Sequence, residues 1–335
     1  MDRYISVDSG KGDTKVCILR ANRIDKFSIE TKMDLSDMSE APEHDTYIVE
    51  YDGQTYKFGR GANQQAPYET TKRSNIHKVA TLTAIALCCD NNDKINVAIG
   101  CPLTIYENLK QRQEYRDFMF PNGYIKIKVK TSTEVIEKTF TIGNGLVFPE
   151  GSGVMYLKMA EFQNKYIGII DIGSLNMNGS IYNHCMMQHD FSITSADLGS
   201  HPLINGLAKA LNAAYSINIT PQWIDNMLKE KDRSQRFVRS KNVPDAAETS
   251  SAFISDFIEK HIEKIFEALT KAQWDICNTD LVFTGGTAGL LEEEIRNAFK
   301  KQGVDNIVIP EEPQYTNALG WLKALAMASK VKFPG

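Results

Sequence analysis

Two short stretches place an aspartate beside a turn between two strand-like segments. In the first, a strand-like stretch ends at Asp8, a glycine-rich turn follows, and a second strand is expected over 16–19. In the second, an apolar run ends at Asp171, and a returning strand is expected over 177–182. The backbone N–H groups of such turns suit phosphate oxygens, and the carboxylate suits a hydrated Mg²⁺ on those phosphates. Each copy alone also fits an ordinary turn, because aspartate and glycine are common turn residues.

The duplication of this motif is more informative than either copy. The two copies lie about half the chain length apart, so each belongs to a different half of the sequence. Two such turns that face each other would hold one polyphosphate between two lobes. The sequence therefore predicts a two-lobed phosphate-binding protein.

Length and composition allow two domains with substantial cores. The chain has 335 residues, of which 42% are apolar, and a domain typically takes roughly 150 residues. The net charge of −4 argues against direct, charge-driven binding of nucleic acid. No N-terminal stretch resembles a signal peptide, and no apolar run approaches the length of a membrane span. We therefore expect a cytoplasmic protein with no membrane contact.

The cysteines and histidines form no recognisable disulfide or metal pattern. The six cysteines, at positions 17, 88, 89, 101, 185 and 277, include no CxxC pair. We expect them to be buried free thiols in a reducing compartment. The six histidines show no HExxH spacing, which argues against a zinc site.

The first half contains a hairpin signal followed by a helix signal. Asp52-Gly53 is a two-residue turn signal inside a hairpin expected over 47–58. The hairpin belongs to a polar section over about 30–75, which is interpreted as a small insertion with loops over 30–46 and 59–75. Apolar residues at helical spacing predict a core helix over 76–89.

Two later patterns in the first half concern a helix cap and a lysine stripe. Thr104 follows a buried strand and is expected to cap a helix that runs to about residue 118. Lys126, Lys128 and Lys130 alternate with apolar residues. The stripe is either an anion-binding face or the solvated side of a half-buried strand, where lysines discourage edge pairing.

Glu150 follows Pro149 at the expected start of a helix that runs to about residue 162. The structural interpretation is that proline and glutamate both favour a first helical turn. The functional interpretation is that the following Gly-Ser-Gly permits close backbone approach and that Glu150 positions a water molecule in a cleft. The sequence pattern alone leaves both open.

The second half combines helices with one glycine-rich turn. A long amphipathic helix is expected over 246–272, and a final helix over 314–330 is expected to return to the first domain. Gly285 and Gly286 separate a strand from a helix, and two glycines there let a flat ring or a phosphate approach the backbone. A basic cluster either contacts phosphates or a partner, or is a solvated linker; it contains Lys231, Arg233, Arg236, Arg239 and Lys241.

Five blocks occur in the order found in the actin, Hsp70 and sugar-kinase superfamily, and the chain resembles that superfamily across nearly its whole length. They are residues 7–15, 148–156, 170–178, 284–290 and 314–322. They resemble, in turn, the first phosphate loop, the first connecting helix with its water-orienting acid, the second phosphate loop, the adenosine motif and the second connecting helix. No GxxxxGK[ST] motif and no GxGxxG motif with a downstream acid compete with this interpretation.

Within the superfamily the chain most resembles the ParM/StbA group of bacterial actin-like plasmid-segregation ATPases. Residues 51–58 and 101–106, and Leu198-Gly-Ser at the start of a helix, support this resemblance. It implies an α/β, actin-like (ribonuclease H-like, duplicated) fold with two lobes and a nucleotide cleft between them. The implied domains are 1–165, to which a C-terminal helix over about 318–335 returns, and 166–317.

The resemblance also implies the role of each candidate site residue. Asp8 and Asp171 are implied to hold Mg²⁺ through water, and Glu150, with Asp171 as second catalytic residue, to orient or deprotonate the attacking water. Lys15 is implied to add positive charge at the phosphates of ATP or GTP. The residues implied to contact the nucleotide are Asp8, Ser9, Gly10, Lys11, Gly12, Asp13, Lys15, Gly173, Ser174, Leu175, Asn176, Gly285, Gly286 and Thr287.

The implied activity is nucleotide hydrolysis coupled to filament formation by identical subunits, which drives plasmid segregation. A small DNA-binding adaptor is the implied partner, and the acidic chain itself is not expected to bind DNA. Two other functions stay open. One is a non-hydrolysing actin-like scaffold, and the other is a small-molecule kinase of the same superfamily.

Overall fold

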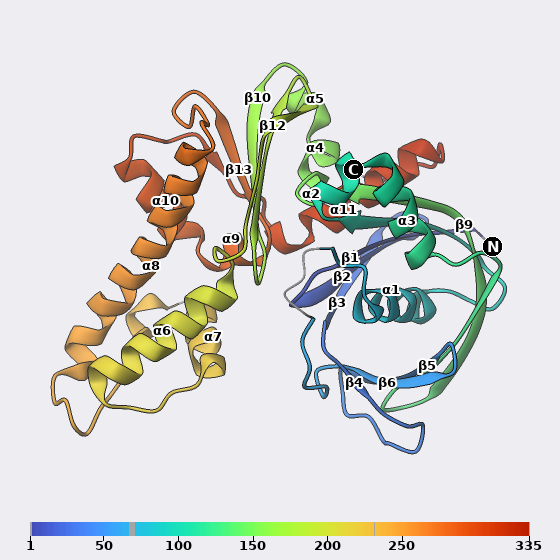
Figure 1. Cartoon of the computed structure of the whole chain (residues 1–335), viewed down its shortest axis with the longest axis horizontal. Coiled ribbons are helices and arrows are strands. Elements are labelled where there is room, and N and C mark those ends of the chain that lie inside the picture. The colour runs from blue at the N-terminus through green and yellow to red at the C-terminus, as the bar shows by residue number, and fades with distance from the viewer. Residues whose placement is uncertain (1, 67–70, 231, 335) are drawn as a thin grey trace. The chain divides into compact units, whose positions relative to one another are not determined.

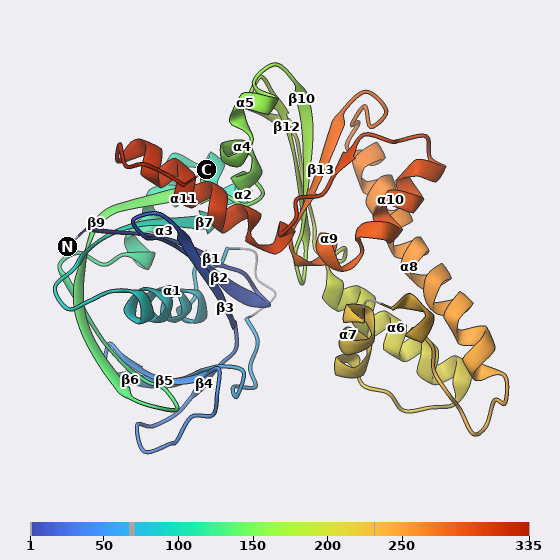
Figure 2. The same cartoon turned by 180° about the vertical axis from the view of Figure 1, so that it is seen from behind.

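The computed structural model describes residues 2–66, 71–230 and 232–334 (Figures 1 and 2). The chain divides into two compact units: unit 1 is Met1–Ala160 with Tyr315–Gly335, and unit 2 is Glu161–Gln314. These divisions fall five and three residues before the predicted ones, at 165/166 and 317/318. Residues 67–70 of the predicted insertion and Lys231 of the basic cluster lie outside the described residues.

Unit 1 is built on a sheet of nine strands. In chain order these are β1 (Asp2–Ser9), β2 (Asp13–Leu19), β3 (Ile24–Glu30), β4 (Met33–Leu35), β5 (Thr46–Tyr51), β6 (Gln54–Gly59), β7 (Lys94–Cys101), β8 (Tyr124–Lys130) and β9 (Val135–Pro149). Their order in the sheet is β3-β2-β1-β7-β9-β8-β5-β6-β4. The predicted insertion is thus not a separate body in the described residues, because its strands extend the main sheet through β8.

Helices cover both faces of this sheet. They are α1 (Asn75–Cys88), α2 (Leu103–Glu107), α3 (Leu109–Met119), α4 (Gly153–Leu157) and α11 (Thr316–Ala328), with the short α5 (Met159–Phe162) and the 3₁₀ turn η2 (Pro313–Tyr315) at the unit boundaries. Helix α1 lies inside the curve of the sheet (Figures 1 and 2) and packs on Ile5 and Val7. Helix α11 packs on the other face, where Ser6 Oγ donates to the Ala318 carbonyl at 2.6 Å. Successive residues of β1 therefore face different helices, as the pleat of a strand requires.

Unit 2 has a five-stranded sheet and a helical core. The strands are β10 (Tyr166–Ile172), β11 (Met177–Asn183), β12 (Met186–Ser195), β13 (Asp280–Thr284) and β14 (Ile307–Val308), in the order β12-β11-β10-β13-β14. The helices are α6 (Ser200–Tyr215), α7 (Pro221–Lys229), η1 (Arg233–Gln235), α8 (Ala246–Lys271), α9 (Gly286–Leu290) and α10 (Glu292–Lys301). The core joins alternate residues of β10, such as Ile170 and Ile172, to the apolar faces of α6, α8 and α10.

The two units repeat one strand pattern. Strand β1 pairs antiparallel with β2 and parallel with β7, and β10 pairs antiparallel with β11 and parallel with β13. Both predicted strand–aspartate–turn–strand hairpins are confirmed. Asp8 and Asp171 are each the last residue but one of the inner strand.

Several local predictions in unit 1 are wrong. Thr104 does not cap one helix, because α2 ends at Glu107 and Asn108 caps α3, its side chain accepting from the Gln111 N–H at 3.1 Å. The polar stretch 30–46 contains the short strand β4. The lysine stripe does not protect an edge, because β8 is paired on both sides, with β9 and with β5.

The basic cluster is solvated only in part, since Arg239 and Lys241 are exposed. Arg236 is buried, with its guanidinium donating to Glu294 at 2.6 Å and to the Leu228 carbonyl at 2.7 Å.

The expectation of buried thiols also fails in part, because Cys277 is exposed and Cys185 half-buried. Among the described residues, no helix combines the length and hydrophobicity needed to cross a bilayer.

Candidate functional site

Asp8 is a buried carboxylate at the end of β1 in unit 1. It pairs across the hairpin with Lys15, and the Asn317 side chain of α11 hydrogen-bonds to it. Burial raises the pKa of Asp8, whereas the charges of Lys72 and Lys15 act in the opposite direction. A carboxylate removed from water in this way is stabilised as an anion by a nearby cation.

The turn after Asp8 is held by its own backbone. The Gly10 N–H donates to the carbonyls of Asp8 at 2.9 Å and Asp13 at 3.1 Å. A Cβ at Gly10 would lie 2.7 Å from the Asp13 oxygen, so the tight turn requires glycine there. The Gly12 carbonyl accepts from the Thr31 N–H at 2.8 Å, and Lys15 Nζ donates to the Asp13 carbonyl at 3.2 Å.

Ser9 faces away from Asp8, toward α1. Its hydroxyl lies 3.1 Å from His77 Nδ1 and 3.4 Å from Thr14 Oγ1. Burial, with the charges of Lys72 and Lys11, lowers the pKa of His77 to about 3, so this imidazole is neutral near pH 7. The Ser9 side chain therefore joins the turn to the enclosed helix, and only its backbone is left for the predicted ligand contact.

Glu150 lies in a turn between β9 and α4. The prediction that it begins a helix is wrong, because β9 runs to Pro149 and α4 begins at Gly153. Its N–H donates to the Cys101 carbonyl at 3.0 Å, and its side chain is buried. Glu150 is thus placed by the parallel pairing of β9 with β7.

Lys72 is the residue that the sequence analysis missed. Its ammonium forms an ion pair with Glu150, and both side chains are less than 10% exposed. Its backbone has φ = 51°, the left-handed region, which typically costs a non-glycine residue about 1–3 kcal/mol. An isolated lysine in a polar stretch carries no local sequence signal of this role.

The second turn, in unit 2, is fixed through backbone carbonyl groups. The Gly173 N–H donates to the Asn176 carbonyl at 2.9 Å. The Gly173 carbonyl accepts from the Ser200 N–H at 3.2 Å and from the Thr287 hydroxyl at 2.7 Å, and the Ser174 carbonyl accepts from the His201 N–H at 2.7 Å. The start of α6 and the start of α9 therefore hold this turn in place, while Leu175 is buried.

Asp171 and Gly285 are in close contact within unit 2. Asp171 is buried, pairs with Asn178 in β11 and lies beside Thr284 in β13. Gly285 has φ = 90°, and a Cβ there would lie 2.6 Å from Asp171 Oδ1 and 2.3 Å from the Ile172 carbonyl oxygen. By contrast, the nearest atom to a Cβ at Gly286 would be 4.0 Å away.

Each unit thus gathers its own share of the predicted residues. Unit 1 brings together Asp8, Lys15, Glu150 and the turn 9–13, and adds Lys72, His77 and Asn317. Unit 2 brings together Asp171, the turn 173–176 and the glycines of 285–286. Thr287 contributes its hydroxyl to the turn.

The donor set suits a cation that is shared with phosphate. Within the described residues, no three His, Cys, Asp or Glu side chains are grouped as for a metal site made by protein alone. Mg²⁺ typically keeps several waters and uses only one or two carboxylates together with phosphate oxygens. Each unit offers one buried carboxylate of the kind that such binding uses, Asp8 in unit 1 and Asp171 in unit 2.

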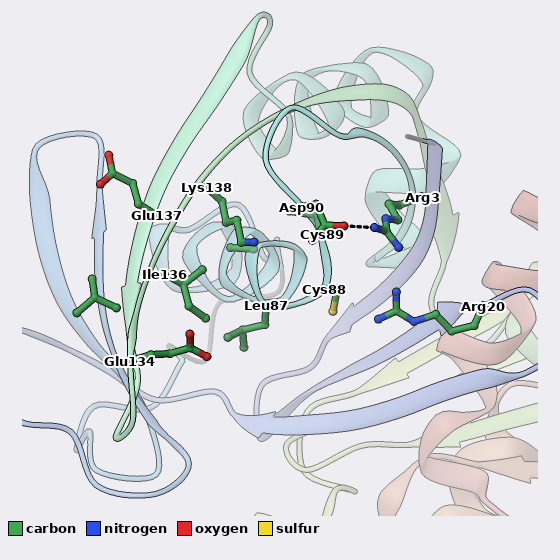
Figure 3. A pocket seen from close by; sticks show the side chains of 12 residues that line it. Arg3, Arg20, Leu87, Cys88, Cys89, Asp90, Glu134, Ile136, Glu137 and Lys138 are labelled. Atoms are coloured by element: carbon green, nitrogen blue, oxygen red, sulfur yellow. Dashed lines mark hydrogen bonds and ion pairs between the residues drawn. The ribbon is translucent and has the colours of Figure 1, made fainter.

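A separate pocket in unit 1, of about 580 Å³, contains none of these residues (Figure 3). Arg3, paired with Asp90, lines one part of it, and Arg20 lies beside Cys88. Glu134, Glu137 and Lys138 also line it, so basic and acidic groups balance. This balance gives no preference for an anionic ligand, and the candidate site rests on the two turns.

Comparisons with known proteins concern the fold of the chain. Residues 6–153 match the family model described as the N-terminal domain of actin-like proteins. No curated protein sequence matches the chain.

Solved structures match over almost the whole chain. An Alp12 filament structure is 26% identical, with 98% of this chain and 99% of that chain covered and a TM-score of 0.70. The archaeal actin homologue Ta0583 in complex with ADP is 16% identical (96% and 99% covered, TM-score 0.73), and Bacillus thuringiensis ParM with ATP is 16% identical (98% and 99%, TM-score 0.69). These matches confirm the actin-like two-domain fold and the predicted resemblance to ParM-type bacterial actin-like proteins.

Proposed function

We propose that this chain is a filament-forming nucleotide hydrolase that drives plasmid segregation by polymerising. The observation that carries the proposal is the repeated hairpin with a buried aspartate at the end of its inner strand, Asp8 in β1 and Asp171 in β10. The similarity to an Alp12 filament structure over 98% of the chain supports self-association.

In this proposal both turns contact the phosphates of one ATP or GTP. Backbone N–H groups of residues 9–12 and 173–176 contribute, but those of Gly10 and Gly173 already donate within their turns. Lys15 adds positive charge. Asp8 and Asp171 would hold Mg²⁺ through water, and the ion would supply neutralising charge at the phosphates.

Glu150 orients the attacking water and accepts its proton as the water oxygen bonds to the γ-phosphorus and the bond to the β-phosphate oxygen breaks. Gly286 leaves room for the nucleoside, and Gly285 lets the backbone pass close to Asp171. Thr287 acts mainly by holding Gly173.

The triphosphate state favours subunits that stack into filaments, and hydrolysis weakens them. A small DNA-binding adaptor links the filament to plasmid DNA in the cytoplasm. The acidic net charge of −4 supports a partner for DNA contact.

Light scattering and phosphate release, recorded together after Mg-ATP or Mg-GTP is added, test this function. We expect scattering to rise, then phosphate to appear and scattering to decay, and the preferred nucleotide to give the larger response. Phosphate release without scattering at tens of micromolar protein would favour a monomeric hydrolase or kinase. Scattering without phosphate release would favour the scaffold.

Replacing Glu150 or Asp171 by alanine should slow phosphate release by about 10²-fold or more and leave assembly possible. Glu137→Ala, which removes an exposed acid from β9, is the matched control and should keep the wild-type rate. Unchanged turnover in both site variants would refute the proposed chemistry.

A further inference from the structure

The Lys72–Glu150 pair combines two unfavourable features in one place. Both side chains are buried, and Lys72 has left-handed backbone geometry. Buried ion pairs are weak contributors to stability, because each charge loses its hydration. Strained residues persist where the surrounding structure enforces them, commonly at functional sites.

The Lys72 charge also reaches the first phosphate turn. It favours the anionic form of Asp8, and it disfavours protonation of His77, which contacts Ser9. Lys72 is therefore a cation close to the unit 1 residues that, in the proposed function, contact the phosphates and position the attacking water.

The pair limits what Glu150 can do while this contact is made. The Lys72 ammonium is in ion-pair contact with Glu150 Oε1 and occupies the position from which a water molecule would donate to that oxygen. A γ-phosphate would offer the ammonium a more highly charged partner, since charge-assisted hydrogen bonds to phosphate are strong.

We propose that Lys72 is a positioning residue that changes partner when the triphosphate binds. Its ammonium holds Glu150 in the nucleotide-free protein and moves to the γ-phosphate in the complex. The released Glu150 oxygen then accepts from the attacking water. This inference rests on the proposed function and adds to it a sensor for the γ-phosphate.

The exchange predicts opposite effects of removing either partner. Lys72→Met removes the γ-phosphate contact, so the preference for triphosphate over diphosphate should fall about tenfold or more. Glu150→Gln removes the competing partner, so the same preference should rise severalfold even as hydrolysis is lost. Lys72→Arg keeps the charge and should retain most of the preference.

Calorimetry tests this exchange. It measures the affinities for Mg-ADP and for a β,γ-imido triphosphate of the preferred base, at protein concentrations below that needed for assembly. Lys130→Met is the control, because that half-buried lysine of unit 1 donates instead to the Met38 carbonyl. Its preference should match the wild type.

Shifts in the same direction for Lys72→Met and Glu150→Gln, or no shift, would overturn the exchange and leave the proposed function standing. If Lys72→Met does not fold, the rise in Glu150→Gln decides the question alone. A wild-type protein that binds neither nucleotide would overturn both the exchange and the proposed function.

Discussion

The two units build the same hairpin and surround its buried aspartate with different groups. In unit 1, the residue opposite the buried aspartate is Lys15, and Lys72 and Glu150 add further buried charges nearby. In unit 2, the residue opposite Asp171 is the neutral Asn178. There the turn is held by hydrogen bonds from helix starts to its carbonyls.

This difference suits the two units to different tasks, one to respond to the charge of a ligand and the other to keep a fixed shape. A site made of charges responds to the charge of a ligand, because ion pairs change partner when a stronger one arrives. A turn held by backbone contacts keeps its shape whatever the ligand, because its hydrogen bonds depend on backbone position. In the proposed function, the charged groups of unit 1 would therefore respond to the phosphates, and the turn of unit 2 would keep its shape.

The largest expected effect on stability comes from the close packing of unit 2 at Gly285. Gly285→Ala should destabilise unit 2 by roughly 2–5 kcal/mol, because the new Cβ meets the Ile172 carbonyl and Asp171 at a positive φ. Gly286→Ala has space and should change stability by less than about 0.5 kcal/mol. Denaturant unfolding of both variants measures the difference, and equal stabilities would contradict the close packing at Gly285.

The next largest expected effect is a loss of stability at low pH caused by two buried histidines, one in each unit. Burial, opposed by a backbone hydrogen bond with Leu198, lowers the pKa of His261 to about 4, and the pKa of His77 is about 3. An unfolded histidine, with a pKa of about 6.5, takes up its proton first as pH falls. Each histidine should therefore remove about 2 kcal/mol of stability between pH 7 and pH 5.

Unfolding curves at both pH values for His77→Asn and His261→Asn check this comparison. Each variant should reduce the pH dependence of stability for its own unit only. Asp197, Lys260 and Lys264 line a pocket with His261 and are unchanged in the His261→Asn variant, so their contribution to the pH dependence is the same in both proteins. A pH dependence identical to that of the wild type would mean that the histidines do not carry it.

The smallest expected effect concerns the Thr287 hydroxyl. Thr287→Val removes its hydrogen bond to the Gly173 carbonyl, which keeps the Ser200 N–H as a donor, so the loss should be only about 1 kcal/mol. Thr287→Ser keeps the hydroxyl and loses a buried methyl group instead. Thermal unfolding of both variants measures the two losses, and a Thr287→Val variant as stable as the wild type would contradict the contribution of the hydroxyl.

Local patterns predicted most of the framework. The hairpin at Asp52-Gly53 follows from turn chemistry that acts within a few residues, and the helix expected over 76–89 follows from apolar spacing. Both form, as the β5–β6 hairpin and as α1. The two hairpins at Asp8 and Asp171 follow from apolar runs that end in turn residues.

The missed features depend on contacts between distant segments. Lys72 meets Glu150 across 78 positions of sequence, and Arg236 meets Glu294 across 58. No local pattern encodes such a pair, so a lysine in a polar stretch and an arginine in a basic cluster both resemble solvated surface. The Thr104 cap fails because Asn108, four residues later, interrupts the helix and caps the next one.

Strand β9 connects the outer part of unit 1 to Glu150 as one strand with an irregularity at Gly143. Its 15 residues pair with β8 along their first half and with β7 toward Pro149, and a strand of that length extends roughly 50 Å. Mechanically it is a long beam held along both sides, bent at its irregularity, with Glu150 directly after its end. A load applied at the β8–β9 hairpin, far from the tip in sequence, is therefore carried to Glu150 through one continuous backbone.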